Sequence, residues 1–377
     1  MPTVTKEMES AAADVLNNEI MVGGESVHKF EEEFAEFIGS DFAASVNSGS
    51  SAILLTFRAL GLRYGEKIIV PSATFIATLA GPTILGATPV FCEIGEDYVV
   101  STKSIADIVS RYSCQYIMPV HLYGYPCDMS AIREVAESKH LTVIEDVAQA
   151  HGARFDGRRT GSFGEASIFS FYPTKNMTVG GDGGMVTTNN KKIYDSVVKM
   201  RDVGRKTKYT HDEMGYTLRL NTMNAAIGRI QLRHLEEWNG RRRDIASSYN
   251  RKLRGIKELI LPQYKNGTCE PVYHIYAVRT RNRNLLGTWL HMNGVATGVH
   301  YPIPVHKQPA CEKYQDFIDL DFTEEWSQTV LSLPMYPHLT EKEQGHIIDM
   351  IQDFYDNRRH ESKIVKEQEM DWARKLI

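Results

Sequence analysis

A carboxylate and a lysine follow two neighbouring apolar runs in the middle of the chain. Asp146 ends the run LTVIED, and Lys175 lies just after the run SIFSFY, which also contains Ser170. Ligands of open α/β sheets bind beyond the carboxyl ends of the strands, so these three side chains are predicted to converge on one ligand. Desolvation would favour the neutral amine of such a lysine, which acts as a nucleophile and then as a general base.

Three β-rich apolar runs supply the strands that must position these residues. They cover 141–144, 167–172 and 185–188, and turn-forming residues separate them. Because side chains alternate along a strand, Glu145 and Asp146 are predicted to point to opposite faces of the sheet. Only one of these two carboxylates can therefore reach a given ligand. A glycine-rich loop, GGDGG, follows Lys175 and lets the backbone approach a ligand closely.

Strands and helices alternate along much of the chain. This alternation predicts a mostly parallel sheet with helices on both faces. Strands are predicted at 42–46, 67–71, 89–94, 116–120 and within 271–280, and helices at 27–38, from near 50, at 224–235 and at 238–249.

Composition excludes several classes of function. The chain has 377 residues, 42% hydrophobic and 24% charged, with a net charge of −4 and no long basic run. Binding to nucleic acid or to a membrane surface therefore has no electrostatic support. Its five cysteines are scattered and odd in number, which argues against a disulfide framework or a zinc site. This cysteine pattern also leads us to expect no metal. The N-terminus lacks an apolar signal core, so we expect a cytoplasmic protein.

Four segments carry a resemblance to a known family. EDVAQAHGA, GSFG, FSFYPTKN and GDGG, in this order, resemble the active-site block of the DegT/DnrJ/EryC1/StrS sugar aminotransferases, which use pyridoxal phosphate. The resemblance extends from about 17 to about 350. It implies a type I pyridoxal-phosphate fold, with a mixed, mainly parallel seven-stranded sheet. The large domain is expected at 1–240 and a small C-terminal domain at 241–377.

The resemblance assigns roles around the cofactor ring. It implies that Lys175 forms the Schiff base, that Asp146 keeps the pyridine nitrogen protonated, and that Gln149 contacts the phenolic oxygen. It also implies that the Phe75 ring stacks on the pyridine and that Ser170 binds the phosphate. Without the resemblance, Phe75 would be interpreted as a core residue.

A helix that begins near Ser50 is a second candidate for the phosphate. Free amide groups at a helix N-terminus bind anions, and the hydroxyls of Ser50 and Ser51 are predicted to assist them. Simple capping by serine is the alternative. The resemblance favours the phosphate site, since family members hold the cofactor phosphate at this turn.

One segment departs from the family pattern. Family members carry G-x-N-x-R, in which the asparagine reaches across a homodimer interface to the partner's cofactor phosphate. Here Thr217 replaces that asparagine, whereas Arg219 matches and is a candidate substrate contact. The resemblance thus implies a homodimer with shared active sites, with Thr217 as the candidate phosphate contact.

The segment HYPIPVHKQPA resembles the family loop that borders the substrate pocket. It makes His300, Tyr301 and His306 candidate substrate contacts, although Pro302 and Pro304 are also typical of a rigid turn. The sequence of this segment resembles that of family members that act on 3-keto nucleotide sugars.

The predicted function is the transfer of an amino group, with glutamate as the donor, to a keto group of a nucleotide-linked keto-deoxysugar. The nucleotide would be dTDP, UDP or GDP, the carbon C-3, and the setting polysaccharide or glycan biosynthesis. One alternative is a cyclitol ketone or another substrate without a nucleotide. Another is a non-catalytic regulator that keeps the fold. Relatives that dehydrate the sugar replace the lysine with histidine, and Lys175 argues against that chemistry.

Overall fold

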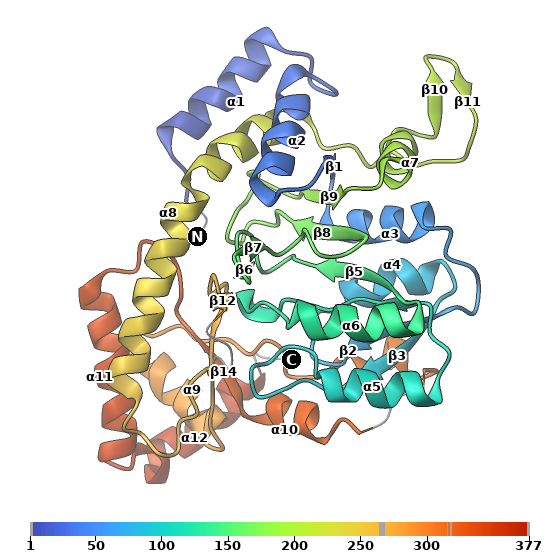
Figure 1. Cartoon of the computed structure of the whole chain (residues 1–377). Coiled ribbons are helices and arrows are strands. Elements are labelled where there is room, and N and C mark those ends of the chain that lie inside the picture. Colours follow the sequence, from blue (N-terminus) through green and yellow to red (C-terminus); the bar gives the residue numbers. More distant parts are fainter. Residues whose placement is uncertain (1–2, 264–267, 315, 317–318, 375–377) are drawn as a thin grey trace.

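A seven-stranded sheet forms the centre of the protein. The computed structural model describes residues 3–263, 268–314, 316 and 319–374 (Figure 1). The strand order is β1-β9-β8-β5-β4-β2-β3. The strands are β1 (Phe42–Val46), β2 (Lys67–Pro71), β3 (Thr88–Cys92), β4 (Tyr116–Ile117), β5 (Thr142–Asp146), β8 (Ala166–Ser170) and β9 (Gly184–Thr188).

Parallel pairing dominates this sheet. The neighbours from β8 to β3 all pair in parallel, whereas β9 runs antiparallel to both β1 and β8. Six strands thus share one direction, and their carboxyl ends lie at one edge. The predicted fold class, a mixed and mainly parallel seven-stranded α/β sheet, is confirmed.

Helices cover both faces, and apolar side chains alternate between them. Ile144 and Ile168 pack on the face that carries α3, α4 and α7, while Val143 and Phe169 pack on the opposite face. That opposite face carries α2, α5, α6 and α8. The helices are α1 (Lys6–Asn18), α2 (Glu25–Ile38), α3 (Gly49–Ala59), α4 (Ala77–Ile84), α5 (Thr102–Arg111), α6 (Met129–Lys139), α7 (Lys191–Arg201) and α8 (Thr222–Leu253).

Helix α8 runs from the large sheet to a smaller unit beside it (Figure 1). It is one continuous helix, whereas the sequence predicted two. The proposed division after residue 240 therefore falls inside α8. The smaller unit contains an antiparallel pair of strands and four helices: β13 (Tyr276–Arg279), β14 (Val330–Leu333), α9 (Arg283–Met292), α10 (Asp321–Thr329), α11 (Glu341–Asp356) and α12 (Lys363–Arg374).

The segment after α9 returns to the large sheet. Val305, Cys311 and Leu320 pack in the same core cluster as Phe91 of β3. This return brings the residues before Val305, including the predicted substrate loop, to the large domain. Short helices mark this region and two others: η1 (Leu122–Gly124), η2 (Val305–Lys307), η3 (Pro309–Cys311) and η4 (Arg359–Glu361).

Two elements lie at the periphery of the protein, the C-terminal helix α12 and a β-hairpin. Trp372 of α12 lies against Gly287 of α9, where an added Cβ would come within 2.2 Å of the indole ring. The hairpin of β10 (Arg205–Thr207) and β11 (Thr210–His211) projects away from the body (Figure 1). The remaining short strands are β6 (Arg154–Phe155), β7 (Arg158–Arg159) and β12 (Cys269–Glu270), which form a small sheet. Among the described residues, no helix is both long and apolar enough to cross a bilayer.

Candidate active site

Asp146 lies at the carboxyl end of β5, on the face that carries α4. Its Oδ2 accepts a hydrogen bond from the Thr78 hydroxyl at 2.8 Å, and its Oδ1 accepts one from the Ala148 amide at 3.1 Å. The side chain is buried, and burial raises the pKa of its carboxyl above the ordinary value, against these two donors and the Lys175 charge. A buried carboxylate of this kind gains stability from a further cationic donor.

Glu145 points to the opposite face, as the alternation predicted. Burial alone would raise its pKa, but His121 and the surrounding amides lower it below the ordinary value. Its oxygens accept hydrogen bonds from His121 Nε2, the amides of Gly161, Phe163 and Gly164, and the Ser167 hydroxyl, at 2.7–3.1 Å. Glu145 is thus fully used in joining the loop after β7 to the sheet.

His121 is part of this structural cluster. Its Nδ1 accepts a hydrogen bond from the Cys127 amide at 3.0 Å, so the ring proton that faces Glu145 is on Nε2. The ring is fully buried. His121 is thus a structural histidine.

Lys175 follows β8 in a tight turn, and its amide donates to the Tyr172 carbonyl at 2.8 Å. Burial lowers the pKa of its amine to about 8, and the Asp146 charge opposes that shift. The Lys175 charge in turn acts on the buried His151 and on the partly buried His300. The structure therefore brings Lys175 and Asp146 to the same edge of the sheet.

The turn between β1 and α3 lies against the end of β8. A Cβ at Gly49 would approach the Ser170 Cβ to 2.8 Å, so only glycine allows this contact. The amides of the first helical turn therefore open beside Ser170. Ser50 is exposed at this turn.

A serine caps α3, as the alternative interpretation of this turn predicted, and the capping residue is Ser48. The helix begins at Gly49, and Ser48 caps it by accepting from the Ser51 amide at 3.1 Å. The Ser51 hydroxyl donates to Asn47 Oδ1 at 2.7 Å and lies 2.9 Å from the Ser48 hydroxyl. The Ser51 side chain is thus held within the turn, because the helix starts one residue earlier than the sequence indicated.

Two aromatic rings and a glutamine line the space beside Asp146. The Phe75 side chain is 54% exposed, and its ring centroid lies 5.8 Å from that of Tyr301. Gln149 donates from Nε2 to the Tyr301 hydroxyl at 3.2 Å and accepts from the Tyr123 amide at 2.7 Å. Phe75 is not a core residue, and an exposed ring at the ligand edge is available for stacking.

The two predicted substrate histidines differ in their surroundings. His300 lies partly buried near the Lys175 charge, with its Nδ1 2.9 Å from the Ser332 hydroxyl, and the Tyr123 hydroxyl donates to its carbonyl. His306 bonds through Nδ1 to the Ser72 hydroxyl and lies 3.2 Å through Nε2 from Glu324. Its ring also packs beside Phe91.

Thr217 and Arg219 lie near the base of the projecting hairpin. Thr217 is exposed and pairs with Asp202 as an isolated bridge. Arg219 donates through a guanidinium nitrogen to Asp202. Both residues are thus placed on one short surface segment of this chain.

Sequence reasoning missed some residues that complete the site. Thr78, three residues after Phe75, donates a hydrogen bond to Asp146. His274 was also missed, because its partners come from distant parts of the chain. Nothing local in PVYHIYAVRT distinguishes a site histidine from one buried beside a strand.

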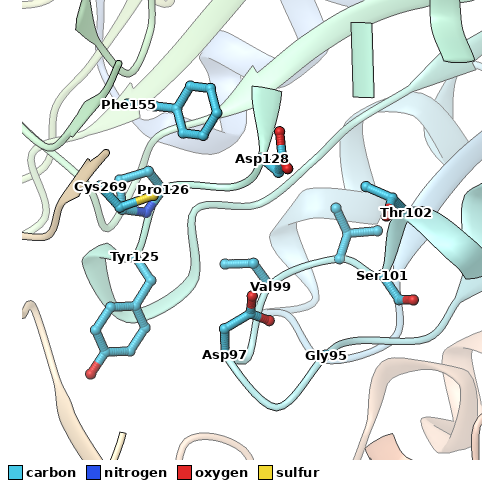
Figure 2. A pocket seen from close by; sticks show the side chains of 11 residues that line it. Gly95, Asp97, Val99, Ser101, Thr102, Tyr125, Pro126, Asp128, Phe155 and Cys269 are labelled. Atoms are coloured by element: carbon cyan, nitrogen blue, oxygen red, sulfur yellow. The ribbon is translucent and has the colours of Figure 1, made fainter. Parts of the chain in front are cut away.

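A separate cavity of about 270 Å³ opens near the first turns of α5 and α6 (Figure 2). Asp97, Ser101, Asp128, Phe155 and Cys269 are among its lining residues. None of the predicted cofactor or substrate residues lines it. The chemistry argued above therefore lies elsewhere on the sheet edge.

These residues fit pyridoxal phosphate. The carboxylate of Asp146 suits a protonated ring nitrogen, and the close approach of Gly49 to Ser170 leaves helix amides and a hydroxyl for the phosphate. The Lys175 amine, with its pKa lowered to about 8, suits condensation with an aldehyde.

Comparisons with known proteins identify the family of this chain. The family model described as the DegT/DnrJ/EryC1/StrS aminotransferase family matches residues 2–352. The chain is 39% identical to the dTDP-3-amino-3,4,6-trideoxy-alpha-D-glucose transaminase of Streptomyces venezuelae, over 92% of each chain. It is 36% identical to the UDP-N-acetyl-3-dehydro-alpha-D-glucosamine 3-aminotransferase of Acidithiobacillus ferrooxidans, over 92% of this chain and 93% of the other.

A solved structure shows the same fold. The crystal structure of S. venezuelae DesV in complex with a ketimine intermediate superposes with a TM-score of 0.89 at 39% identity, covering 93% of this chain and 95% of the other. The fold is that of the type I pyridoxal-phosphate aminotransferases. The chain belongs to the DegT/DnrJ/EryC1/StrS aminotransferase family.

Proposed function

We propose that this enzyme transfers an amino group from glutamate to the C-3 keto group of a nucleotide-linked keto-deoxysugar, with pyridoxal phosphate as cofactor. The observation that carries the proposal is the position of two buried groups at one sheet edge. These are Asp146, whose carboxyl pKa is raised by burial, and Lys175, whose amine pKa is lowered by burial. Both relatives described above carry names that place the amino group at C-3. Their nucleotides differ, so dTDP and UDP are both candidate carriers.

Lys175 supplies the nucleophile and moves the proton. With a pKa of about 8, about one amine in ten is neutral at pH 7, compared with about one in 3,000 at the ordinary value of 10.5. The neutral Nζ then takes the proton from the carbon that carries the donor's amino group. Burial of this amine is thus the physical source of its reactivity.

Asp146 would accept a hydrogen bond from the ring nitrogen of the cofactor and keep that nitrogen protonated. The Thr78 hydroxyl and the Ala148 amide fix both carboxylate oxygens and thereby orient the side chain. Pyridoxal phosphate, when bound, supplies the electron sink that stabilises a carbanion next to the transferred amine. Phe75 would lie on the ring, Gln149 beside its phenolic oxygen, and Ser170 with the first turn of α3, including Ser50, at its phosphate.

The substrate side of the site is proposed from the 300–306 segment. His300 and Tyr301 lie close to Gln149 and to the charge of Lys175, so they are the better placed substrate contacts. Both ring nitrogens of His306 already have hydrogen-bond partners, Ser72 and Glu324. We therefore propose that His306 holds this segment in place and does not contact the substrate. A cyclitol ketone remains the alternative acceptor, and a non-catalytic regulator the alternative function.

A homodimer with shared active sites is proposed for the assembly. Ile20, Met21 and Val22 are exposed apolar residues in one short segment, next to the helices α1 and α2. Thr217 is exposed and free to present its hydroxyl to a partner's cofactor phosphate. All five cysteines are free, which supports a cytoplasmic enzyme.

The test is a visible absorption spectrum of the protein with added pyridoxal phosphate, before and after glutamate, beside Lys175→Ala. We expect a cofactor band in the wild type that bleaches with glutamate, followed by amine transfer to C-3 keto sugars of dTDP or UDP. Lys175→Ala should retain the fold, as measured by circular dichroism, and should lose turnover. Full activity of that variant would sink the mechanism, whereas failure of the wild type to bind the cofactor would favour the regulator.

A further inference from the structure

Two buried asparagines connect Lys175 to the rest of the site. Asn176, the next residue in the chain, donates from Nδ2 to Asn239 Oδ1 and to the Val272 carbonyl, both at 3.0 Å. Asn239 of α8 donates from its own Nδ2 to the His151 carbonyl at 2.8 Å. Both asparagines are almost fully buried. The lysine turn is thus joined to α8, to the segment before β13 and to the loop that follows Asp146.

These contacts determine the protonation of a histidine. The Val272 carbonyl can only accept a hydrogen bond, so the amide nitrogen of Asn176 faces it and the Asn176 oxygen faces away. That oxygen lies 3.1 Å from His274 Nδ1 and must accept from it. The ring proton of neutral His274 is therefore on Nδ1, which leaves Nε2 unprotonated.

His274 stays neutral in this environment. Burial lowers its pKa well below the ordinary value, and the charges of Lys175 and Arg242 lower it further. The same Lys175 charge acts on His300 and His151, while Asp146 is the carboxylate that faces the amine. The backbone at His274 is also held, because Arg242 donates to the carbonyls of Tyr273 and of His274 itself.

We propose that His274 is a positioning residue for Lys175, acting through the hydrogen bond from its Nδ1 to Asn176. A lysine side chain has four rotatable bonds, so its amine reaches two carbons in turn only if the main chain of its turn is fixed. The bond from His274 anchors that main chain one residue away. This inference rests on the proposed function of Lys175.

Two substitutions separate the roles of the two ring nitrogens. In His274→Asn the amide nitrogen occupies the place of Nδ1 and keeps the donor to Asn176, whereas in His274→Gln the amide nitrogen occupies the place of Nε2. We expect kcat/KM to fall about 10- to 100-fold in His274→Gln and to stay within about threefold in His274→Asn, since a small misplacement costs this much. His291→Gln, an exposed histidine of α9, is the control.

A second readout needs no cofactor. The pH dependence of Lys175 labelling by trinitrobenzenesulfonate, followed by peptide mass spectrometry, gives the pKa of the amine in the cofactor-free protein. We expect a midpoint near 8 in the wild type and in His274→Asn, and a higher midpoint in His274→Gln, because a loosened turn admits water to the amine. The visible circular dichroism of the loaded enzyme should weaken in His274→Gln alone.

The outcomes are distinct. An equal loss of kcat/KM in His274→Asn and His274→Gln would overturn the role of Nδ1. Unchanged Lys175 labelling and unchanged visible dichroism in His274→Gln would overturn the positioning role. If the wild type binds no cofactor, the proposed function fails, and the labelling comparison still decides whether His274 anchors Lys175. Thermal unfolding of each variant shows whether the fold is retained.

Discussion

Two adjacent carboxylates at the end of β5 lie on opposite faces of the sheet, and their pKa values are shifted in opposite directions. Glu145, on the face of α5 and α6, accepts five hydrogen bonds, and its pKa is lowered in spite of its burial. Asp146, on the face of α4, accepts two, and burial raises its pKa. Both side chains are almost fully buried, so burial alone does not explain the difference.

The difference shows how a structural and a functional carboxylate are told apart. Hydrogen-bond donors of the same chain already compensate the charge of Glu145. Three of these bonds attach the loop at 161–164 to the sheet, so the role of Glu145 is structural. Asp146 has only two hydrogen-bond donors among the described residues for a buried charge, and the charges of Lys175 and His121 do not offset its burial, so its pKa stays raised. A cofactor with a protonated ring nitrogen would supply the missing partner.

The largest expected effect comes from Asp146→Asn. The neutral amide can keep the contacts with Ala148 and Thr78 but leaves the buried ring cation unpaired, a loss of about 3–5 kcal/mol, so kcat should fall by about 10² to 10³-fold or more. Steady-state kinetics with saturating cofactor measures the fall. The cofactor-free variant should unfold at the same or a higher temperature than the wild type, and a less stable cofactor-free variant would contradict this account.

Glu145→Gln should show the reverse pattern. All five groups around Glu145 donate, and an amide nitrogen among them leaves buried donors unpaired, so we expect a loss of about 2–4 kcal/mol in the free energy of unfolding. Urea unfolding of the two matched variants, each a control for the other, provides the measurement. Activity per folded molecule should change by less than the effect of Asp146→Asn, and an equal loss of activity would break the comparison.

Thr78→Val tests how far the orientation of Asp146 matters. This change keeps the shape of the side chain and removes one hydrogen bond to a charged group, which contributes about 1.5–3 kcal/mol. We expect kcat/KM to fall by about 10- to 100-fold and the unfolding temperature to fall by a few degrees. Thr83→Val, on the same helix and bonded only to backbone carbonyls, is the matched control. Equal activity of the two variants would show that Asp146 needs no second anchor.

The smallest effect is a difference in pH dependence. The lowered pKa of Glu145 means that its contribution to stability is present above its unfolded pKa and is lost as the pH falls through its folded pKa. The raised pKa of Asp146 has the opposite sign, because its contribution is present in acid and is lost as the pH rises. Unfolding between about pH 3 and 8 should therefore show the deficit of Glu145→Gln constant above about pH 4.5 and shrinking below it, and the gain of Asp146→Asn growing as the pH rises above about 4.

Local sequence pattern was sufficient for much of the fold. The strands at 42–46 and 67–71 were predicted to the residue, because apolar runs between turn residues depend only on neighbours along the chain. The predicted helix at 27–38 was confirmed as α2, which ends at Gly39 in the left-handed region with φ 83°. The opposite directions of Glu145 and Asp146 followed from the two-residue period of a strand.

Tertiary contacts decided the rest. The sequence divided α8 into two helices, since its polar middle gives no local reason to continue, and only packing against both the large sheet and the smaller unit makes it one helix of 32 residues. The start of α3 at Gly49 depends on the close approach of this turn to Ser170 of β8.

The sequence by itself determined the chemistry of the site: a lysine and an aspartate after successive strands, within a pattern that resembles one family. It could not determine how these groups are held. Thr78 reaches Asp146 from 68 residues away, and His274 reaches Asn176 from 98 residues away. Hydrogen bonds of this range leave no local pattern, and burial, which sets the pKa values of Asp146 and Lys175, exists only once the chain has folded.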